Sequence, residues 1–187
     1  MTEKGYHHPD SINHQIMLQI LFNLAEYAII LLMDKIDLKI LSELQQNARI
    51  TNQELSERVN LSPTPCLRRV KMLEEAGIIK GYSAIVDPET YGLPIMAFVS
   101  VRLERQTEAE IASFEAAIME LDEIVACYLM SGRHDYMLQV FARSLKDYEN
   151  FVRNSLTRVP GLGELETYFA FGQVKRSMAL PSLRHSK

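Results

Sequence analysis

Cysteine is scarce in this chain of 187 residues, and its scarcity argues against two kinds of stabilisation. Cys66 and Cys127 are the only cysteines. Both lie in segments that we expect to be internal, which argues against a disulfide framework and fits a reducing cytoplasm. Two cysteines without nearby histidines also make a poor zinc site. Since His7, His8 and His14 are too loosely spaced to replace them, we predict no metal and no cofactor.

Excess positive charge is absent as well. Twenty lysines and arginines stand against 24 aspartates and glutamates, so the formal net charge is −4 at pH 7. This balance argues against a protein that coats nucleic acid without regard to sequence. It does not argue against sequence-specific binding, because a short segment can carry the positive charge that DNA contacts require.

The common catalytic motifs are also missing from the chain. It has no nucleophile elbow, no phosphate-binding loop and no H-E-x-x-H helix. His134 beside Asp135 resembles an acid/base pair, but adjacent side chains in a loop usually diverge. We therefore expect a binding protein and keep an enzyme only as an alternative.

One long apolar run exists, in residues 16–33, and it allows three interpretations. Its length of about 18 residues is near the lower limit for spanning a membrane, and it contains Gln19, Asn23 and Glu26. Lys4 is the only lysine or arginine before it, which fits poorly with a signal peptide or an oriented span. The run is an upstream extension that ends where Met33 starts the protein, an extra packed helix, or a membrane anchor; we expect no membrane association.

Residues 51–82 are the most informative part of the chain, and they begin with a short capped helix. Thr51 and Glu54 have the spacing of a capping box, in which each side chain bonds to the backbone N–H of the other. Asn60 stands in the break after this helix, where a left-handed residue is needed. The pattern predicts a first helix followed by a tight turn.

A second, basic helix follows the break. We expect Ser62 to cap it, Pro63 to occupy its first position and Gly77 to end it. No acidic residue occurs in 58–73. Helix, short turn and capped basic helix are typical of a helix-turn-helix, whose second helix lies in the DNA major groove.

The second helix has an apolar and a polar side. At about 100° per residue, its apolar residues form one stripe that would pack on the preceding helices. The polar residues on the other side are free to meet phosphates and base edges, although most such faces are simply solvated. The apolar set is Cys66, Val70 and Leu73, with Leu67 at its margin; the candidate DNA-binding residues are Ser62, Thr64, Pro65, Arg68, Arg69 and Lys71.

Beyond this helix, residues 78–86 alternate in polarity and resemble a small hairpin, or wing, and the turn-rich segment 87–94 is the best domain boundary. The next elements predict strands at 95–103, 124–130, 136–142 and 165–174, and helices at 107–121 and 145–159. The order βαββαβ indicates an α+β fold: a winged helix-turn-helix followed by a ferredoxin-like domain. One face of its sheet would lack cover, which predicts a homodimer formed through the sheets.

The loop before the third strand has two properties of a binding site. Backbone N–H groups around Gly132 can converge on a carboxylate, and Asp135 can hold an ammonium group, so the loop could bind both poles of a free amino acid. The alternative is that both residues only shape a tight turn.

The run LSPTPCLRRVKMLEEAGIIKGYSAIVDP closely resembles the leucine-responsive/AsnC group of transcription regulators, also called feast/famine regulators. The resemblance extends from Met33 to about Ala179, and it favours residues 1–32 as an extension. It implies that 33–86 bind DNA, that 87–94 are a linker, that 95–180 sense an effector and assemble subunits, and that 181–187 are a tail.

The resemblance also implies an effector site between dimers. Gly132, Asp135 and Tyr136 match the family's Gly-x-x-Asp-Tyr loop, and Tyr168 matches a position linked to effector response. The alternative for Tyr168 is an aromatic strand residue that packs at an interface. Arg133 and His134 occupy the middle of the loop, where many relatives have an acidic or aromatic residue, so the effector's identity stays open.

These observations predict a cytoplasmic, amino-acid-responsive regulator that binds an operator in double-stranded DNA. We expect a homodimer that assembles further to a tetramer or octamer. The alternative is an architectural DNA-binding protein without an effector.

Overall fold

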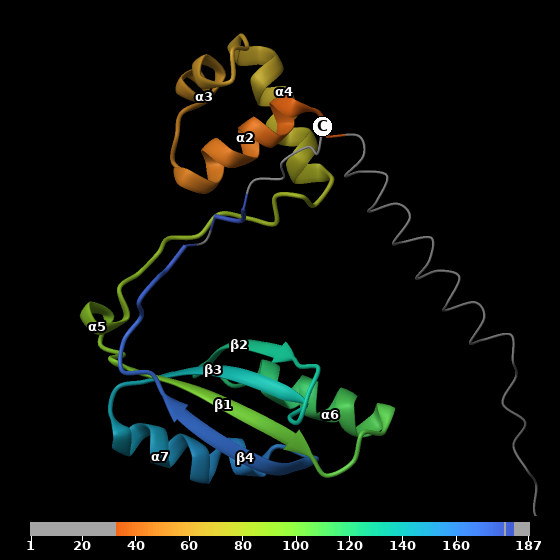
Figure 1. Ribbon diagram of the computed structural model, residues 1–187, viewed down its shortest axis with the longest axis vertical. Helices are drawn as coiled ribbons and strands as arrows, with labels where there is room; N and C mark the ends of the chain where they lie inside the picture. Colours follow the sequence, from red (N-terminus) through yellow and green to blue (C-terminus); the bar gives the residue numbers. More distant parts are fainter. Residues whose placement is uncertain (1–32, 178, 182–187) are drawn as a thin grey trace, which may run out of the picture. The chain divides into compact units, whose positions relative to one another are not determined.

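The computed structural model describes residues 33–177 and 179–181 (Figure 1). The chain forms two compact units. The first contains the residues up to Ser83 and those from Ser177 onward, and the second comprises Ala84–Arg176. The predictions for residues 1–32, including the apolar run and the three histidines, lie outside the described residues. Within the described part, no helix is long and apolar enough to cross a membrane, and no three potential metal ligands cluster.

Three helices build the first unit: α2 (Lys35–Gln46), α3 (Asn52–Arg58) and α4 (Pro63–Glu75). The Asp34 side chain caps α2 and forms a complete capping box with Asp37. The apolar stripes of the three helices meet in one core, which explains why such short helices are stable. Its buried members are Ile40, Leu55, Val59, Cys66 and Leu73.

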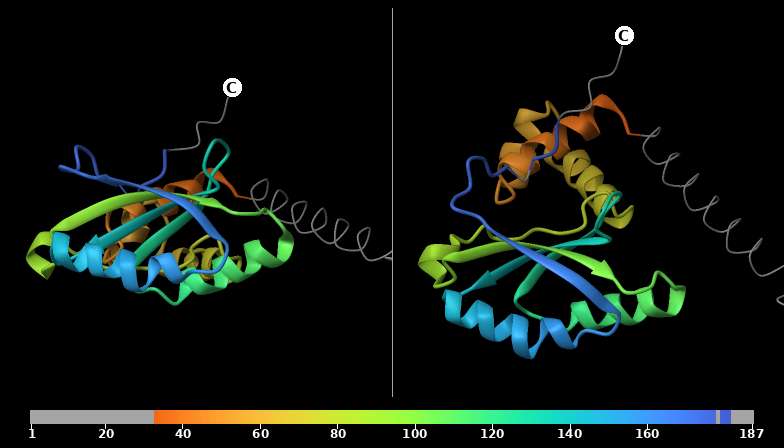
Figure 2. Two further views of the ribbon diagram at one scale, coloured as in Figure 1. Left: turned by 90° about the horizontal axis from the view of Figure 1, so that it is seen from below. Right: turned by 60° about the horizontal axis from the view of Figure 1, so that its bottom comes forward.

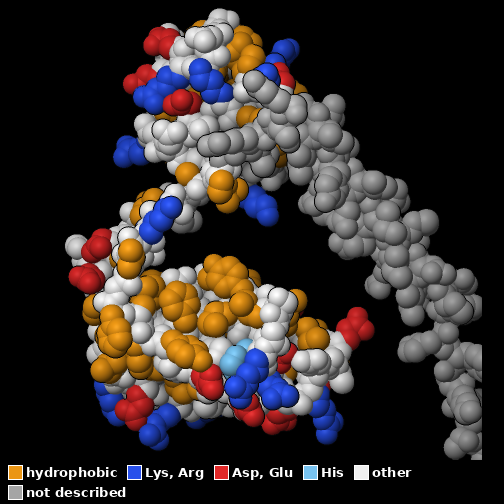
Figure 3. Space-filling model, in the orientation of Figure 1, with side chains coloured by type: hydrophobic (Ala, Val, Ile, Leu, Met, Phe, Trp, Pro, Cys, Tyr) orange, Lys and Arg blue, Asp and Glu red, His pale blue; other side chains and the backbone are white. Residues whose placement is uncertain are grey.

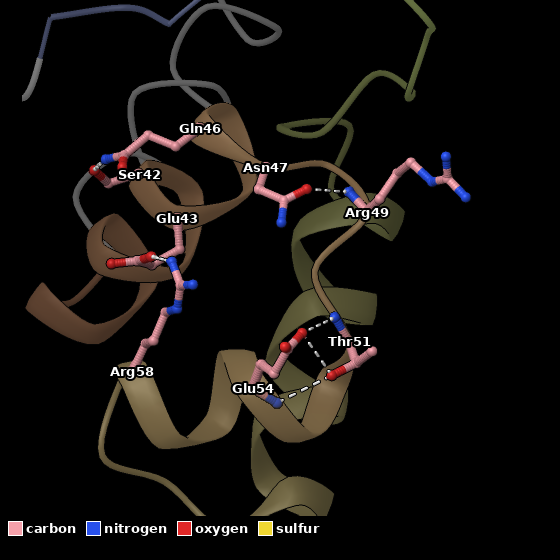
Figure 4. Close-up of polar contacts among 8 residues, drawn as sticks. All are labelled: Ser42, Glu43, Gln46, Asn47, Arg49, Thr51, Glu54 and Arg58. Carbon is pink, nitrogen blue, oxygen red and sulfur yellow. Dashed lines mark hydrogen bonds and ion pairs between the residues drawn. The ribbon is translucent and has the colours of Figure 1, made fainter.

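The predicted capping box at the start of α3 is confirmed, and Figure 4 shows its bonds. Thr51 Oγ1 accepts from the N–H of Glu54 at 3.2 Å, and Glu54 Oε2 accepts from the N–H of Thr51 at 3.1 Å. At the other end of α3, Arg58 pairs with Glu43 of α2 at 2.9 Å. Asn60 follows with φ of 58°, the left-handed conformation that the break was expected to need.

The start of α4 differs from expectation in one respect. Ser62 is the N-cap residue and Pro63 follows in the first turn, as predicted, but the Ser62 side chain accepts no capping hydrogen bond. The sequence removes one of the two usual donors: a cap side chain usually accepts from the second or third helical N–H, and Pro65, at the third position, has none. Gly77, with φ of 69°, ends the helix as predicted, and the N–H of Ile78 returns to the carbonyl of Leu73 at 3.0 Å.

The hairpin predicted over residues 78–86 is not formed. These described residues contain no strand: Ile78 and Ile79 pack against the core of the first unit, and the chain continues to the second unit without regular secondary structure. An isolated two-stranded hairpin is only marginally stable in water. The side chains that could stabilise one here are not buried: Ile85 is 65% exposed and Val86 is 50% exposed. Tyr82 instead donates a hydrogen bond to Glu74 of α4 at 2.9 Å. A single turn, α5 (Pro88–Tyr91), follows in the segment 87–94.

The second unit has the predicted βαββαβ order. Its strands are β1 (Ile95–Leu103), β2 (Ile124–Leu129), β3 (Tyr136–Ala142) and β4 (Leu162–Phe169), and its helices are α6 (Glu108–Met119) and α7 (Leu145–Asn154), with the 3₁₀ turn η1 (Leu156–Arg158) after α7. The sheet is antiparallel in the order β2-β3-β1-β4. Both helices cover the same face of it (Figure 2).

Two boundaries of this unit were predicted wrongly. The last strand ends at Phe169 and not at Val174, because the pairing of β4 with β1 ends where Phe169 lies opposite Ala97. The second helix ends at Asn154, and the chain continues through η1 to Pro160. Neither change alters the topology.

The two faces of the sheet have different environments. Side chains toward the helices are buried, among them Val99, Val101, Leu138 and Val140. On the opposite face Phe98 pairs with Tyr168, and no described element covers them. Figure 3 shows hydrophobic side chains gathered on this unit. The apolar members of this open face are Met96, Phe98, Tyr128, Met137, Phe141 and Tyr168.

Cys127 was expected to be internal, but it is exposed, whereas Cys66 is buried as predicted. It lies on β2, an edge strand, opposite the buried Leu138 of β3. The edge strand has no neighbour on its outer side, which leaves Cys127 accessible despite its position on the helix-covered face.

The different caps of α3 and α4 lead to a test. Thr51→Ala removes a side-chain acceptor and should lower the free energy of unfolding by about 1 kcal/mol. Ser62→Ala removes no capping bond and should change it by less than about 0.5 kcal/mol. Urea unfolding followed by circular dichroism measures both, and equal losses would contradict the assigned caps.

Candidate functional sites

The helix α4 has one buried and one exposed side. Cys66 and Leu73 are buried in the core. Thr64, Arg68 and Lys71 are exposed and lie four and three residues apart, so they form one strip along the helix. Within the described part of the chain, Arg68 and Lys71 make no ion pair. The strip therefore offers two free cations and a hydroxyl to an anionic ligand.

Arg69 flanks this strip, and it is paired with two carboxylates of the first unit, which the sequence did not predict. Its guanidinium lies 2.7 Å from Asp37 Oδ1 and 2.9 Å from Asp34 Oδ2, at the start of α2. The hydrogen bond and charge of Asp37, followed by those of Asp34, raise the pKa of Arg69. Because both carboxylates engage this guanidinium through Nη1, Arg69 holds α4 against the start of α2.

The start of α4 is held from α3 by a residue that the sequence did not suggest. The Asn52 side-chain amide donates to the carbonyl of Pro63 at 2.9 Å. Eleven residues separate the two, and no local pattern marks the pair. Asn52 thus fixes where the exposed strip begins.

Two further predicted DNA-binding residues lie at the same helix end. Ser62 is exposed, and its hydroxyl is free of a capping bond. Pro65 is half-buried and has no N–H to donate. A polar ligand at this end can therefore be met by the hydroxyls of Ser62 and Thr64, whereas Pro65 contributes shape alone.

In the second unit, the Asp135 carboxylate is already bonded within the fold. Its Oδ2 accepts from the N–H of Leu103 at 2.8 Å, and its Oδ1 accepts from the side-chain amide of Gln106 at 2.6 Å. The N–H of Asp135 donates to the carbonyl of Val101 at 2.8 Å. Asp135 therefore fastens the β2–β3 loop to the end of β1, in agreement with the turn-shaping alternative.

Tyr136 is also a structural residue. It is 2% exposed on the helix-covered face of the sheet, packs against Phe114, and donates to Glu115 at 2.8 Å. Burial and the Glu115 carboxylate raise the pKa of Tyr136 to about 12. Its side chain lies on the helix-covered face and does not reach the open face.

Arg133 and His134 of the β2–β3 loop form a polar cluster with two residues of β4, Glu166 and Tyr168, at the open face of the sheet. His134 Nε2 lies 3.6 Å from Glu166 Oε2, and Tyr168 donates to that same oxygen at 2.6 Å. The Tyr168 hydrogen bond, followed by the charges of His134 and Arg133, lowers the pKa of the Glu166 carboxyl. Gly132 is exposed in the same loop, with open space where a side chain would start.

Glu166 is the member of this cluster that sequence reasoning missed. It lies on β4 opposite Ser100 of β1, and its role follows from sheet register alone. With Arg133 and His134 it brings a negative and a positive group together at one place, which is the requirement for binding a zwitterion.

A separate cavity of about 550 Å³ lies at the other end of β3. Arg143, Asp147 and Asn150 line it together with Asp122 and Glu123. None of the predicted effector residues lines this cavity, so it is separate from the polar cluster around Glu166.

Comparison with known sequences gives two domain matches. Residues 33–80 match the domain described as winged helix-turn-helix DNA-binding, and residues 96–180 match the Lrp/AsnC ligand binding domain. The Leucine-responsive regulatory protein of Haemophilus influenzae is 42% identical over 145 residues, which cover 78% of this chain and 87% of that protein. Its counterpart in Escherichia coli K12 is 40% identical over 148 residues, covering 79% and 90%.

A solved structure is similar over the same region. The L-Met complex of a transcriptional regulator from Neisseria meningitidis is 40% identical and has a TM-score of 0.76. The match covers 80% of this chain and 96% of that one. The sequence matches and the structural match therefore cover both units of the chain.

Proposed function

The chain belongs to the Lrp/AsnC family of transcription regulators, and on that premise we propose that Thr64, Arg68 and Lys71 contact its operator DNA. The observation that carries this proposal is the exposed strip on α4, whose cations are free while the neighbouring Arg69 is engaged. In a helix-turn-helix the first turns of the second helix reach base edges in the major groove, and the residues around them hold phosphates. Ser62 stands at the correct end of α4 to take a phosphate with its hydroxyl.

The effector side of the proposal rests on the polar cluster of the second unit. A free amino acid has a carboxylate and an ammonium group, and Arg133 and Glu166 supply the opposite charges. His134 and Tyr168 both contact Glu166, so a ligand that binds there would displace or reorganise these contacts. In this proposal Asp135 and Gly132 shape the loop, and Glu166 takes the role that the sequence alone suggested for Asp135.

We propose that the open face of the sheet is covered by a second copy of the chain. Six apolar residues lie on it, and Tyr168 and Tyr128 remain 52% and 56% exposed in the single chain. At about 25 cal/mol per Å² of apolar surface, burying such a face is strongly favourable. A dimer presents two α4 helices, which fits a palindromic operator with half-sites spaced by whole helical turns. Further assembly to a tetramer or octamer belongs to the same proposal.

The family is one of regulators, and this supports a role as a binding protein that acts in the cytoplasm and carries out no catalysis. The response to amino acids distinguishes it from an architectural DNA-binding protein. Membrane association forms no part of the proposal.

The sheet-mediated dimer can be tested with two single variants. One places a charge inside the proposed interface, and the other, the control, places a charge outside it. Phe98→Glu places a carboxylate in the open face, and a dimer would bring two such charges into an apolar interface. Sedimentation velocity should give a dimer or larger assembly for the parent and a monomer for this variant. Met119→Glu is the control, because Met119 is 81% exposed on α6, on the other side of the sheet. A Phe98→Glu variant that keeps the parent's assembly would refute the proposed interface.

The two neighbouring arginines of α4 test the DNA contact. Arg68→Ala should weaken operator binding by about 1–3 kcal/mol if Arg68 reads a base, and should leave melting unchanged. Arg69→Ala should lower the free energy of unfolding by about 1 kcal/mol, since its ion pairs are partly exposed, and should affect DNA binding less. Fluorescence anisotropy on operators selected from genomic fragments, with melting curves, separates the two. Equal DNA affinity for the parent and Arg68→Ala would rule out the exposed strip as the DNA contact.

A further inference from the structure

Leu67 is an exposed apolar residue on the DNA-facing half of α4. Its side chain is 45% exposed, and it is not part of the apolar core of the first unit. Thr64 precedes it by three residues and Lys71 follows it by four, so all three share one side of the helix. Leu67 therefore lies at the margin of the buried side of α4 and borders the exposed strip.

Exposure of a single leucine needs no explanation in general. The position of Leu67 is informative because it lies in the second turn of α4, where a recognition helix approaches base edges. A leucine side chain cannot bond to a phosphate or to the polar atoms of a base. On the base edges of the major groove, the apolar group available to it is the C5-methyl of thymine.

We propose that Leu67 reads thymine in each operator half-site by packing on its C5-methyl group. This inference rests on the proposed DNA contact of α4 and goes beyond it, because Arg68 and Lys71 supply charge whereas Leu67 supplies a preference for one base. Thr64 and Lys71, on either side of Leu67, hold the helix against the backbone so that the leucine is presented to the groove floor.

The effect of the contact can be isolated, because deoxyuridine differs from thymidine only by that methyl group. Removing one methyl group from an apolar contact lowers the affinity about fourfold. Neither the Watson–Crick pairing nor the polar pattern of the groove changes with this replacement. A loss of affinity on replacing thymidine by deoxyuridine therefore reports the methyl contact and not a hydrogen bond.

The experiment uses the full chain and an operator selected from a random duplex library. Each thymidine of the operator is replaced by deoxyuridine, one symmetric pair of positions at a time, and affinity is measured by fluorescence anisotropy. We expect one position per half-site at which the replacement weakens binding by the parent about fourfold per half-site. In Leu67→Ala and Leu67→Gln, thymidine and deoxyuridine at that position should bind alike.

Met72→Ala is the matched control. Met72 is also apolar, 59% exposed and on α4, but it lies five residues further along, about 140° around the helix. This variant should keep the parent's discrimination between thymidine and deoxyuridine. Melting curves for all three variants verify that they are folded, as expected for changes at exposed positions.

Two outcomes overturn the inference: no position at which the parent distinguishes deoxyuridine, or Leu67 variants that distinguish it as the parent does. Both leave the proposed function intact provided that Arg68→Ala still weakens binding to the same operator. If the selection yields no duplex bound more tightly than random DNA, the proposed function itself fails.

Discussion

The helix α4 must bury one side against α2 and α3 and keep the other side free, and the arrangement of the first unit serves that requirement. Arg69 is bound by two carboxylates at the start of α2, and Asn52 of α3 holds the carbonyl of Pro63. These contacts fix the rotation and the start of α4. The rotation in turn decides that Arg68 and Lys71 are exposed while Cys66 is buried. The DNA contact that we propose follows from this placement, and the net charge of −4 does not conflict with it.

The second unit poses the opposite problem, because its sheet has one face covered by helices and one face that no described element covers. A second copy of the chain resolves this in our account and brings two recognition helices into one particle. The cluster of Glu166, His134, Arg133 and Tyr168 lies at the edge of that same open face. An effector that binds there can change the contact between subunits, which gives the bound amino acid a physical route to the DNA-binding units.

Features set by neighbouring residues could be predicted from the sequence. The Thr51 cap, the left-handed Asn60, the end of α4 at Gly77 and the βαββαβ order all follow from local patterns. Two contacts between distant residues could not be predicted: Arg69 meets Asp37, and Asp135 meets Leu103, 32 residues away in each case. Glu166 was missed because only sheet register brings it to His134. The missing cap bond of Ser62 is different, since Pro65 in the sequence already removes the third N–H.

The most direct test of the account is the affinity of the full chain for its selected operator, measured with and without each of the twenty free amino acids. Coupling between two sites of one protein is typically worth about 1–3 kcal/mol, or about 5–150-fold in affinity. We predict that at least one amino acid changes the operator dissociation constant by a factor in this range. Operator affinity that none of the twenty changes would contradict the account and would identify an architectural DNA-binding protein instead.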